Sequence, residues 1–110
     1  MERSQAFTSA NGATIHYQTV GSGPPLIVIP GGLSIAADFD AFANVLAESF
    51  TVHTIERRGR GRSSPQDAGY SIAVECEDLC TLQKATQATC LFGHSYGGLI
   101  ALEAARNNGP

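Results

Sequence analysis

The stretch "FGHSYGG", residues Phe92 to Gly98, places Ser95 between glycines at the spacing G-x-S-x-G. Residues 89–94, "TCLFGH", form a short apolar run typical of a strand, and "YGGLIALEAARNNGP" begins as a helix that ends near Asn108. A strand, a sharp turn and a helix in this order are the setting of a nucleophile elbow, where a strained turn exposes a serine hydroxyl. The pattern therefore predicts Ser95 as a nucleophile, with glycines on both sides leaving room for close backbone approach.

Outward from this turn, strand patterns alternate with helical patterns. Two extended runs in residues 5–20 flank Asn11-Gly12, a dipeptide that favours a tight hairpin turn. Further apolar runs predict strands at residues 26–29, "LIVI", and 50–56, "FTVHTIE". This alternation predicts an α/β fold, a three-layer sandwich with a mostly parallel sheet, helices on its faces and an antiparallel N-terminal hairpin.

Two helical patterns lie between these strands. Asp38 or Asp40 is expected to cap the first, whose apolar stripe comprises Phe39, Phe42, Ala43, Leu46 and Ala47. Ser71 precedes the second, which has Ile72, Cys76, Leu79 and Cys80 on one side and Glu75, Glu77, Asp78 and Lys84 elsewhere. We therefore expect Cys76 and Cys80 to face the core and the charged residues to lie away from it.

Composition limits the class of protein. The chain has 110 residues, 43% of them hydrophobic and 15% charged, which suits one globular domain of ordinary size and not a disordered chain. A formal net charge of -3 predicts no nucleic-acid partner and no attraction to anionic membranes. The same charge leaves small molecules or proteins as the expected partners. No apolar run is long enough for a signal peptide or a membrane span, so we expect a cytoplasmic protein.

The chain shows no pattern for a metal or a nucleotide cofactor. Three cysteines, Cys76, Cys80 and Cys90, lack the spacing of a metal site and are interpreted as small buried thiols. "GRGRSS" lacks the third glycine of a dinucleotide fingerprint, and "GSGPPL" precedes its strand instead of following it. We therefore expect no cofactor.

An oxyanion formed at Ser95 needs hydrogen-bond donors. The backbone N–H of Tyr96, the residue after the serine, is the first candidate. The second is expected from "IPGGL", the loop after residues 26–29, where Gly32 is the preferred donor and Leu33 the alternative.

Basic residues and histidines do not extend this site. Four arginines, Arg57, Arg58, Arg60 and Arg62, lie in "RRGRGRSS". Such a cluster can bind phosphate, but without interleaved aromatic residues we interpret it as organising a loop through hydrogen bonds to carbonyls and carboxylates. The three histidines, His16, His53 and His94, are interpreted as packing or surface residues, not as the catalytic base.

With "PGG", "RRGRGRSS" and "GHSYGG" following three successive strands, the chain resembles the α/β-hydrolase fold superfamily, in particular serine hydrolases with a "GHSxGG" elbow. The resemblance covers nearly the whole chain. It implies Ser95 as nucleophile, with Tyr96 and Gly32 as backbone oxyanion donors. The serine argues against close likeness to the dehalogenases and epoxide hydrolases, which have aspartate there. Two departures are Pro30, where many relatives have histidine, and Glu56, where many have aspartate.

In this superfamily the acid and the histidine of the triad follow the serine in the chain. Residues 96–110 contain Glu103 as the sole acid and no histidine. We therefore expect the N-terminal portion of a hydrolase domain, either a fragment of a longer gene product or part of a nicked or split protein. A complementing segment or chain would then supply the base, and the 110 residues alone would be close to inactive.

Two other functions remain open from the sequence. Acyl transfer to an acceptor other than water uses the same residues. A non-catalytic module that keeps the fold for ligand binding or for docking to a partner is the alternative from another class. The leading hypothesis is hydrolysis of an ester, thioester or amide through an acyl-enzyme on Ser95.

Overall fold

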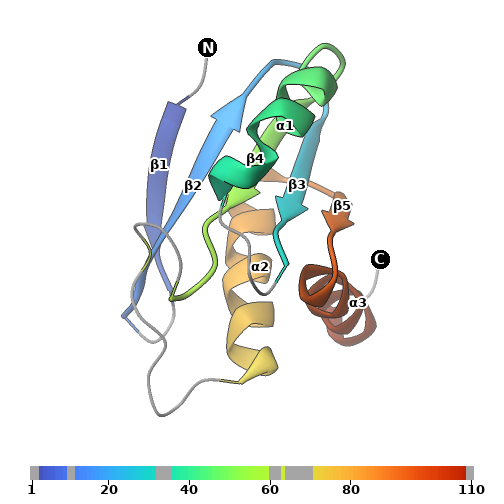
Figure 1. Ribbon diagram of the computed structural model, residues 1–110. Helices are drawn as coiled ribbons and strands as arrows, with labels where there is room; N and C mark the ends of the chain where they lie inside the picture. The colour runs from blue at the N-terminus through green and yellow to red at the C-terminus, as the bar shows by residue number, and fades with distance from the viewer. Residues whose placement is uncertain (1–2, 10–11, 32–35, 60–62, 64–70, 109–110) are drawn as a thin grey trace.

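The strands and helices follow one another in the predicted order (Figure 1). The computed structural model describes residues 3–9, 12–31, 36–59, 63 and 71–108. The elements are β1 (Arg3–Thr8), β2 (Thr14–Val20), β3 (Pro25–Ile29), the 3-10 helix η1 (Ala36–Phe39), α1 (Asp40–Leu46), β4 (Thr51–Ile55), α2 (Ile72–Thr86), β5 (Cys90–Gly93) and α3 (Tyr96–Asn108).

The strands form a mixed sheet in the order β1-β2-β4-β3-β5. The hairpin of β1 and β2 is antiparallel and β2 is antiparallel to β4, whereas β3 is parallel to both β4 and β5. Within the described residues, parallel pairing is thus confined to β4, β3 and β5. The predicted α/β fold and its antiparallel N-terminal hairpin are confirmed.

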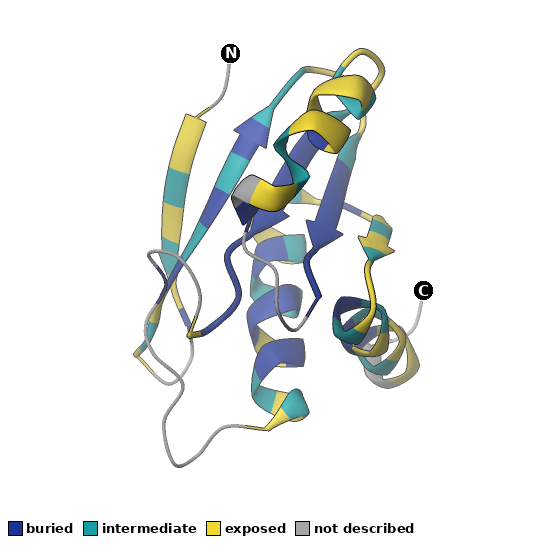
Figure 2. Ribbon diagram, in the orientation of Figure 1, coloured by how far each residue is buried: buried dark blue, intermediate teal, exposed yellow. Residues whose placement is uncertain are grey.

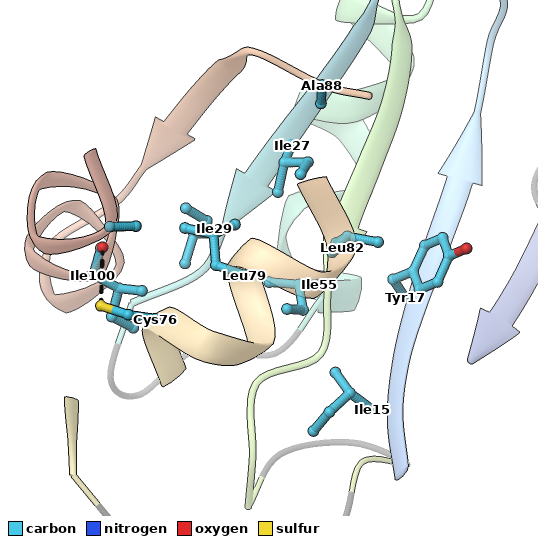
Figure 3. Close-up of a cluster of buried hydrophobic side chains, with 11 residues drawn as sticks. Ile15, Tyr17, Ile27, Ile29, Ile55, Cys76, Leu79, Leu82, Ala88 and Ile100 are labelled. Atoms are coloured by element: carbon cyan, nitrogen blue, oxygen red, sulfur yellow. Dashed lines mark hydrogen bonds between the residues drawn. The ribbon is translucent and has the colours of Figure 1, made fainter. Parts of the chain in front are cut away.

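Helices cover both faces of the sheet and complete three layers. On one face, α2 and α3 pack against β2, β3 and β4 through a cluster that includes Ile27, Ile29, Leu79, Leu82 and Ile100 (Figure 3). On the other face, α1 packs through Ala43 against Val28 and Val52. Successive side chains of a strand point to opposite faces, so β3 contributes to both clusters.

Burial is greatest at the centre of the sheet, where β3 and β4 are dark blue in Figure 2. Residues 26–29 are all buried, which explains why this run lacks the alternation of a half-exposed strand. β1 and β5 are more exposed, because each pairs on one side only within the described part of the chain.

Helix α2 begins where the sequence predicts. Ser71 is its N-cap, with the side-chain oxygen accepting a hydrogen bond from Val74 N. Cys76 is buried and its thiol donates to the carbonyl of Ile100, while Cys80 is half-buried. The expectation that Glu75 and Asp78 lie away from the core is wrong, because each is buried in an ion pair with an arginine from the loop after β4.

Two smaller expectations are also corrected. Neither Asp38 nor Asp40 caps α1: the N-cap is Phe39, with no side-chain hydrogen bond, because η1 already turns the chain helically into α1. Cys90 is exposed, not buried, since it lies on the edge strand β5. Among the described residues, no helix has the length and apolar character needed to cross a membrane.

The buried His53 predicts a pH dependence of stability. Burial, and secondarily the charge of Arg3, lower the pKa of His53 below its ordinary value. Below about pH 6.5 the unfolded chain therefore binds a proton at His53 more readily than the native chain does. The free energy of unfolding consequently decreases as the pH falls through this range. The loss is at most about 1.4 kcal/mol per pH unit for this one group. Urea unfolding between pH 7 and 5 should show a shallower slope for His53→Gln, and identical slopes would contradict the assignment.

The edge at β5 predicts self-association of the 110-residue chain when it is isolated. Phe92 on this strand and Leu99 and Leu102 on α3 are exposed, and an apolar sheet edge invites pairing with another chain. Sedimentation velocity should show oligomers that dissociate in Leu99→Lys/Leu102→Lys. Val45→Lys is the matched control, since Val45 is as exposed as Leu102 but lies on α1. A wild-type monomer that unfolds cooperatively would refute this expectation.

Candidate active site

Ser95 lies in the turn between β5 and α3 and is exposed. Its φ of 57° falls in the left-handed region, which residues other than glycine seldom adopt. Two backbone bonds of 2.9 Å close the turn, from Gly97 N to His94 O and from Gly98 N to Ser95 O. This sharp, strained passage from strand to helix is the geometry that an elbow requires.

Glycines on either side of Ser95 allow the end of β3 to meet the start of α3. A Cβ on Gly97 would overlap the carbonyl oxygen of Ile29 and would lie 2.8 Å from that of Pro30. A Cβ on Gly93 would lie 2.5 Å from the carbonyl oxygen of Gly97. A side chain at Gly97 would push α3 away from the end of β3, and a side chain at Gly93 would push β5 away from α3. Glycine is therefore required at both positions for space and not for a positive φ.

The glycine loop after β3 also lies against the turn that carries Ser95. A Cβ on Gly31 would lie 3.1 Å from Ser95 Cβ and 2.9 Å from the carbonyl oxygen of His94. The structure therefore brings the start of the predicted oxyanion loop against the serine. The preferred donor Gly32 and the alternative Leu33 lie outside the described residues. Tyr96, whose N–H is the other predicted donor, is the first residue of α3.

Arg57 joins these segments from the loop after β4. Its guanidinium forms a bidentate ion pair with Glu75, with 2.6 Å from Nε to Oε1 and 2.8 Å from Nη2 to Oε2. Nη1 donates to the carbonyl of Gly31 at 2.9 Å and more weakly to that of Pro30 at 3.5 Å. The ring of Tyr96 lies 4.8 Å from Cζ, a cation–π contact.

Arg58 forms a similar pair one helical turn further along α2. Its Nε and Nη2 donate to Asp78 at 2.6 and 2.9 Å, and Nη2 also donates to Ser9 Oγ at 3.0 Å. Burial raises the pKa of Asp78, and the Arg58 guanidinium acts in the opposite direction. The interpretation of the arginines as organisers of the loop is confirmed for Arg57 and Arg58, whereas Arg60 and Arg62 lie outside the described residues.

The sequence patterns do not predict two parts of this framework. One is the pairing of Glu75 and Asp78 with the arginines. The other is Ser63, whose hydroxyl donates to the carbonyl of Glu56 and accepts from the backbone N–H of His16 at 2.8 Å. The spacing of carboxylates on α2, at i and i+3, matched to two adjacent arginines, was the available signal for the ion pairs.

The three histidines lie in strands or pack against other side chains. His16 lies in the ladder between β1 and β2, and the ring of His53 bonds Thr19 through Nδ1 at 2.8 Å. The ring of His94 packs edge-on against Phe39. In the described ranges, no group of three histidine, cysteine, aspartate or glutamate side chains could hold a metal ion.

Comparison with known proteins assigns a family to this geometry. The model of the group described as "Alpha/beta hydrolase family" matches residues 26–109. The chain is 38% identical over 96 residues to the uncharacterised hydrolase YraK of Bacillus subtilis, covering 84% of this chain and 35% of that protein. It also superposes on the N-formylmaleamic acid deformylase of Pseudomonas putida S16 with a TM-score of 0.89 and 34% identity, covering 96% of this chain and 42% of that one.

The similarity extends to a soluble epoxide hydrolase of a Corynebacterium species, 31% identical over 100 residues, 89% of this chain and 35% of that protein. The expectation that Ser95 excludes close likeness to epoxide hydrolases is therefore wrong for the chain as a whole. A single elbow position contributes little to identity over 100 residues. In each of these comparisons the chain spans less than half of the other protein.

The crowding at the elbow predicts opposite effects for two adjacent glycines. Gly97→Ala forces its new methyl group into the carbonyl of Ile29 and should destabilise the fold by about 3 kcal/mol. In Gly98→Ala the methyl group meets its nearest atom, Gly93 O, at 3.4 Å, and helix propensity favours alanine by about 0.5–1 kcal/mol. Urea unfolding of both variants tests this difference, and equal effects would show that β3 and α3 are not in such close contact.

Proposed function

This chain belongs to the alpha/beta hydrolase family, and we propose that the protein hydrolyses an ester, thioester or amide through an acyl-enzyme on Ser95. The observation that carries the proposal is the conformation of Ser95, exposed at a φ of 57° between β5 and α3. The backbone of Gly31 packed against it supports the same conclusion, since an oxyanion loop must lie beside the nucleophile.

In the proposed reaction, Ser95 Oγ attacks the carbonyl carbon of the substrate while its proton passes to a base. The π electrons of the carbonyl move to its oxygen, which accepts hydrogen bonds from the backbone N–H of Tyr96 and, as we propose, of Gly32. The positive end of the α3 dipole lies at Tyr96 and favours this negative charge. Collapse of the intermediate expels the leaving group, which takes up the proton, and a water molecule then releases the acid by the same steps.

We place the base and its acid partner in a segment or chain outside these 110 residues. The order of the triad in this fold supports this, because both partners follow the nucleophile. Glu103, which follows Ser95 on α3, forms a surface ion pair with Arg106, with 2.8 Å between Oε2 and Nη2. That pair lowers the pKa of Glu103, as expected for a carboxylate that stabilises a helix surface.

The names of similar proteins suggest which type of bond in the substrate is cleaved. One similar structure is named a deformylase, and removal of a formyl group is an acyl transfer, which supports an amide or ester as substrate. Transfer of the acyl group to an acceptor other than water would use the same residues. The exposed edge strand β5, which carries Phe92, favours a second candidate function, a docking module without catalysis.

A fluorophosphonate probe tests the nucleophile. In the whole gene product that carries these residues, the probe should label Ser95 covalently, because only an activated serine reacts rapidly at neutral pH. Mass spectrometry of the digested protein identifies the labelled peptide. Labelling should be abolished in Ser95→Ala and unchanged in Ser22→Ala, a control at another exposed serine.

Two outcomes would overturn the proposal. Equal labelling of wild type and Ser95→Ala would remove Ser95 as nucleophile. A folded whole gene product with no labelling at all would favour the docking module. The isolated 110-residue chain should react only at the background rate of an ordinary serine.

A further inference from the structure

We propose that Arg57 is a positioning residue for the oxyanion site, because its guanidinium holds both segments from which the oxyanion donors are expected. The inference rests on the proposed function and adds a residue to it. Arg57 comes from the loop after β4, distant in sequence from both the glycine loop after β3 and the elbow after β5. Its action is through the backbone and ring of other residues, not through contact with substrate.

The first contact orients a peptide group. Arg57 Nη1 donates to the carbonyl oxygen of Gly31 at 2.9 Å. A trans peptide group is planar, with its carbonyl and the following N–H directed to opposite sides. Fixing the carbonyl therefore fixes the direction of the N–H at the other end of the same planar group. That N–H belongs to Gly32, which lies outside the described residues and is the second oxyanion donor that we propose.

The second contact is with the residue that follows the nucleophile. The ring of Tyr96 lies 4.8 Å from Arg57 Cζ, so the guanidinium faces the first residue of α3. A cation over the face of an aromatic ring is attracted to it, and burial strengthens the attraction. One side chain thus touches the glycine loop and the start of α3 together.

Glu75 makes this arrangement rigid. Its two carboxylate oxygens accept from Nε and Nη2, which fixes the plane of the guanidinium and directs Nη1 toward Gly31. Both side chains of the pair are almost fully buried. A planar fork with five donors can make these contacts at once, whereas a lysine ammonium on a flexible stem has no such fork.

The neighbouring pair provides a matched control. Arg58 and Asp78 have the same bidentate geometry and the same burial, and both pairs connect the loop after β4 to α2. They differ in the further contact, since Arg58 bonds Ser9 Oγ near the hairpin turn, whereas Arg57 bonds Gly31. A general loosening of α2 should follow from loss of either pair, but an effect on the oxyanion should follow from loss of Arg57 alone.

The test replaces each pair as a whole in the whole gene product. Removing one partner would leave a buried charge, whereas apolar residues of similar size in both positions generally preserve the fold. The variants are Arg57→Met/Glu75→Leu and, as control, Arg58→Met/Asp78→Val. The measurements are the second-order rate of Ser95 labelling by a fluorophosphonate, kcat and KM for p-nitrophenyl acetate, and the urea midpoint.

Ser95 in the Arg57 pair variant should be labelled about 100-fold more slowly, as expected when one oxyanion donor is lost. For p-nitrophenyl acetate, kcat should decrease by a similar factor while KM changes little. The Arg58 pair variant should stay within about threefold of wild type, since it leaves the oxyanion donors in place. Wild-type rates in the Arg57 pair variant, or equal slowing in both pair variants, would overturn the positioning role.

Three further outcomes separate failure of this inference from failure of the fold or of the proposed function. If the Arg57 pair variant does not fold, Arg57→Lys decides, because it keeps a charge opposite Glu75. Slowing by tenfold or more at an unchanged urea midpoint supports the inference, and a wild-type rate overturns it. If wild-type protein shows no labelling of Ser95, the proposed function itself fails. If wild type is labelled and the Arg57 variants react equally well, only the role of Arg57 fails.

Discussion

The close contact between the end of β3 and the start of α3 is the constraint on which the candidate site depends. It requires glycine at position 97, and the contact of α3 with β5 likewise requires glycine at position 93. Between these two glycines, Ser95 adopts a left-handed conformation that residues other than glycine seldom adopt. The contact survives because β3 is buried on both faces, between α1 and the pair α2 and α3. Exposure of the Ser95 side chain is thus a consequence of tight packing directly beneath it.

The two buried ion pairs are better explained by orientation than by stability. The free-energy cost of removing two charges from water offsets most of the attraction between them. A buried ion pair therefore adds little net stability compared with apolar residues. Each pair, however, directs a guanidinium to a third group, Gly31 for Arg57 and Ser9 for Arg58. Together they hold α2 to the start of the loop after β4, with a directionality that apolar contacts lack.

Much of this was predictable from sequence, because glycine spacing, apolar runs and caps are local signals. Ser95 in its turn, Ser71 as the cap of α2 and the burial of residues 26–29 all follow from a few neighbouring residues. Charge alone favours solvent, so the sequence predicts that Glu75 and Asp78 lie away from the core. Their burial depends on arginines 18 and 20 residues away, a tertiary contact that helical periodicity does not encode.

Strand register explains how such distant segments come to share one edge. β4, β3 and β5 are parallel, so their carboxyl ends lie together, and ligand sites of α/β sheets form outside those ends. Gly93 pairs with Ile29, and His94 N donates to the carbonyl of Ile29 at 3.1 Å. A slip of one residue in β5 would reverse its faces and carry Ser95 away from Gly31. The register that fills the core therefore also sets the distance between the candidate nucleophile and its loop.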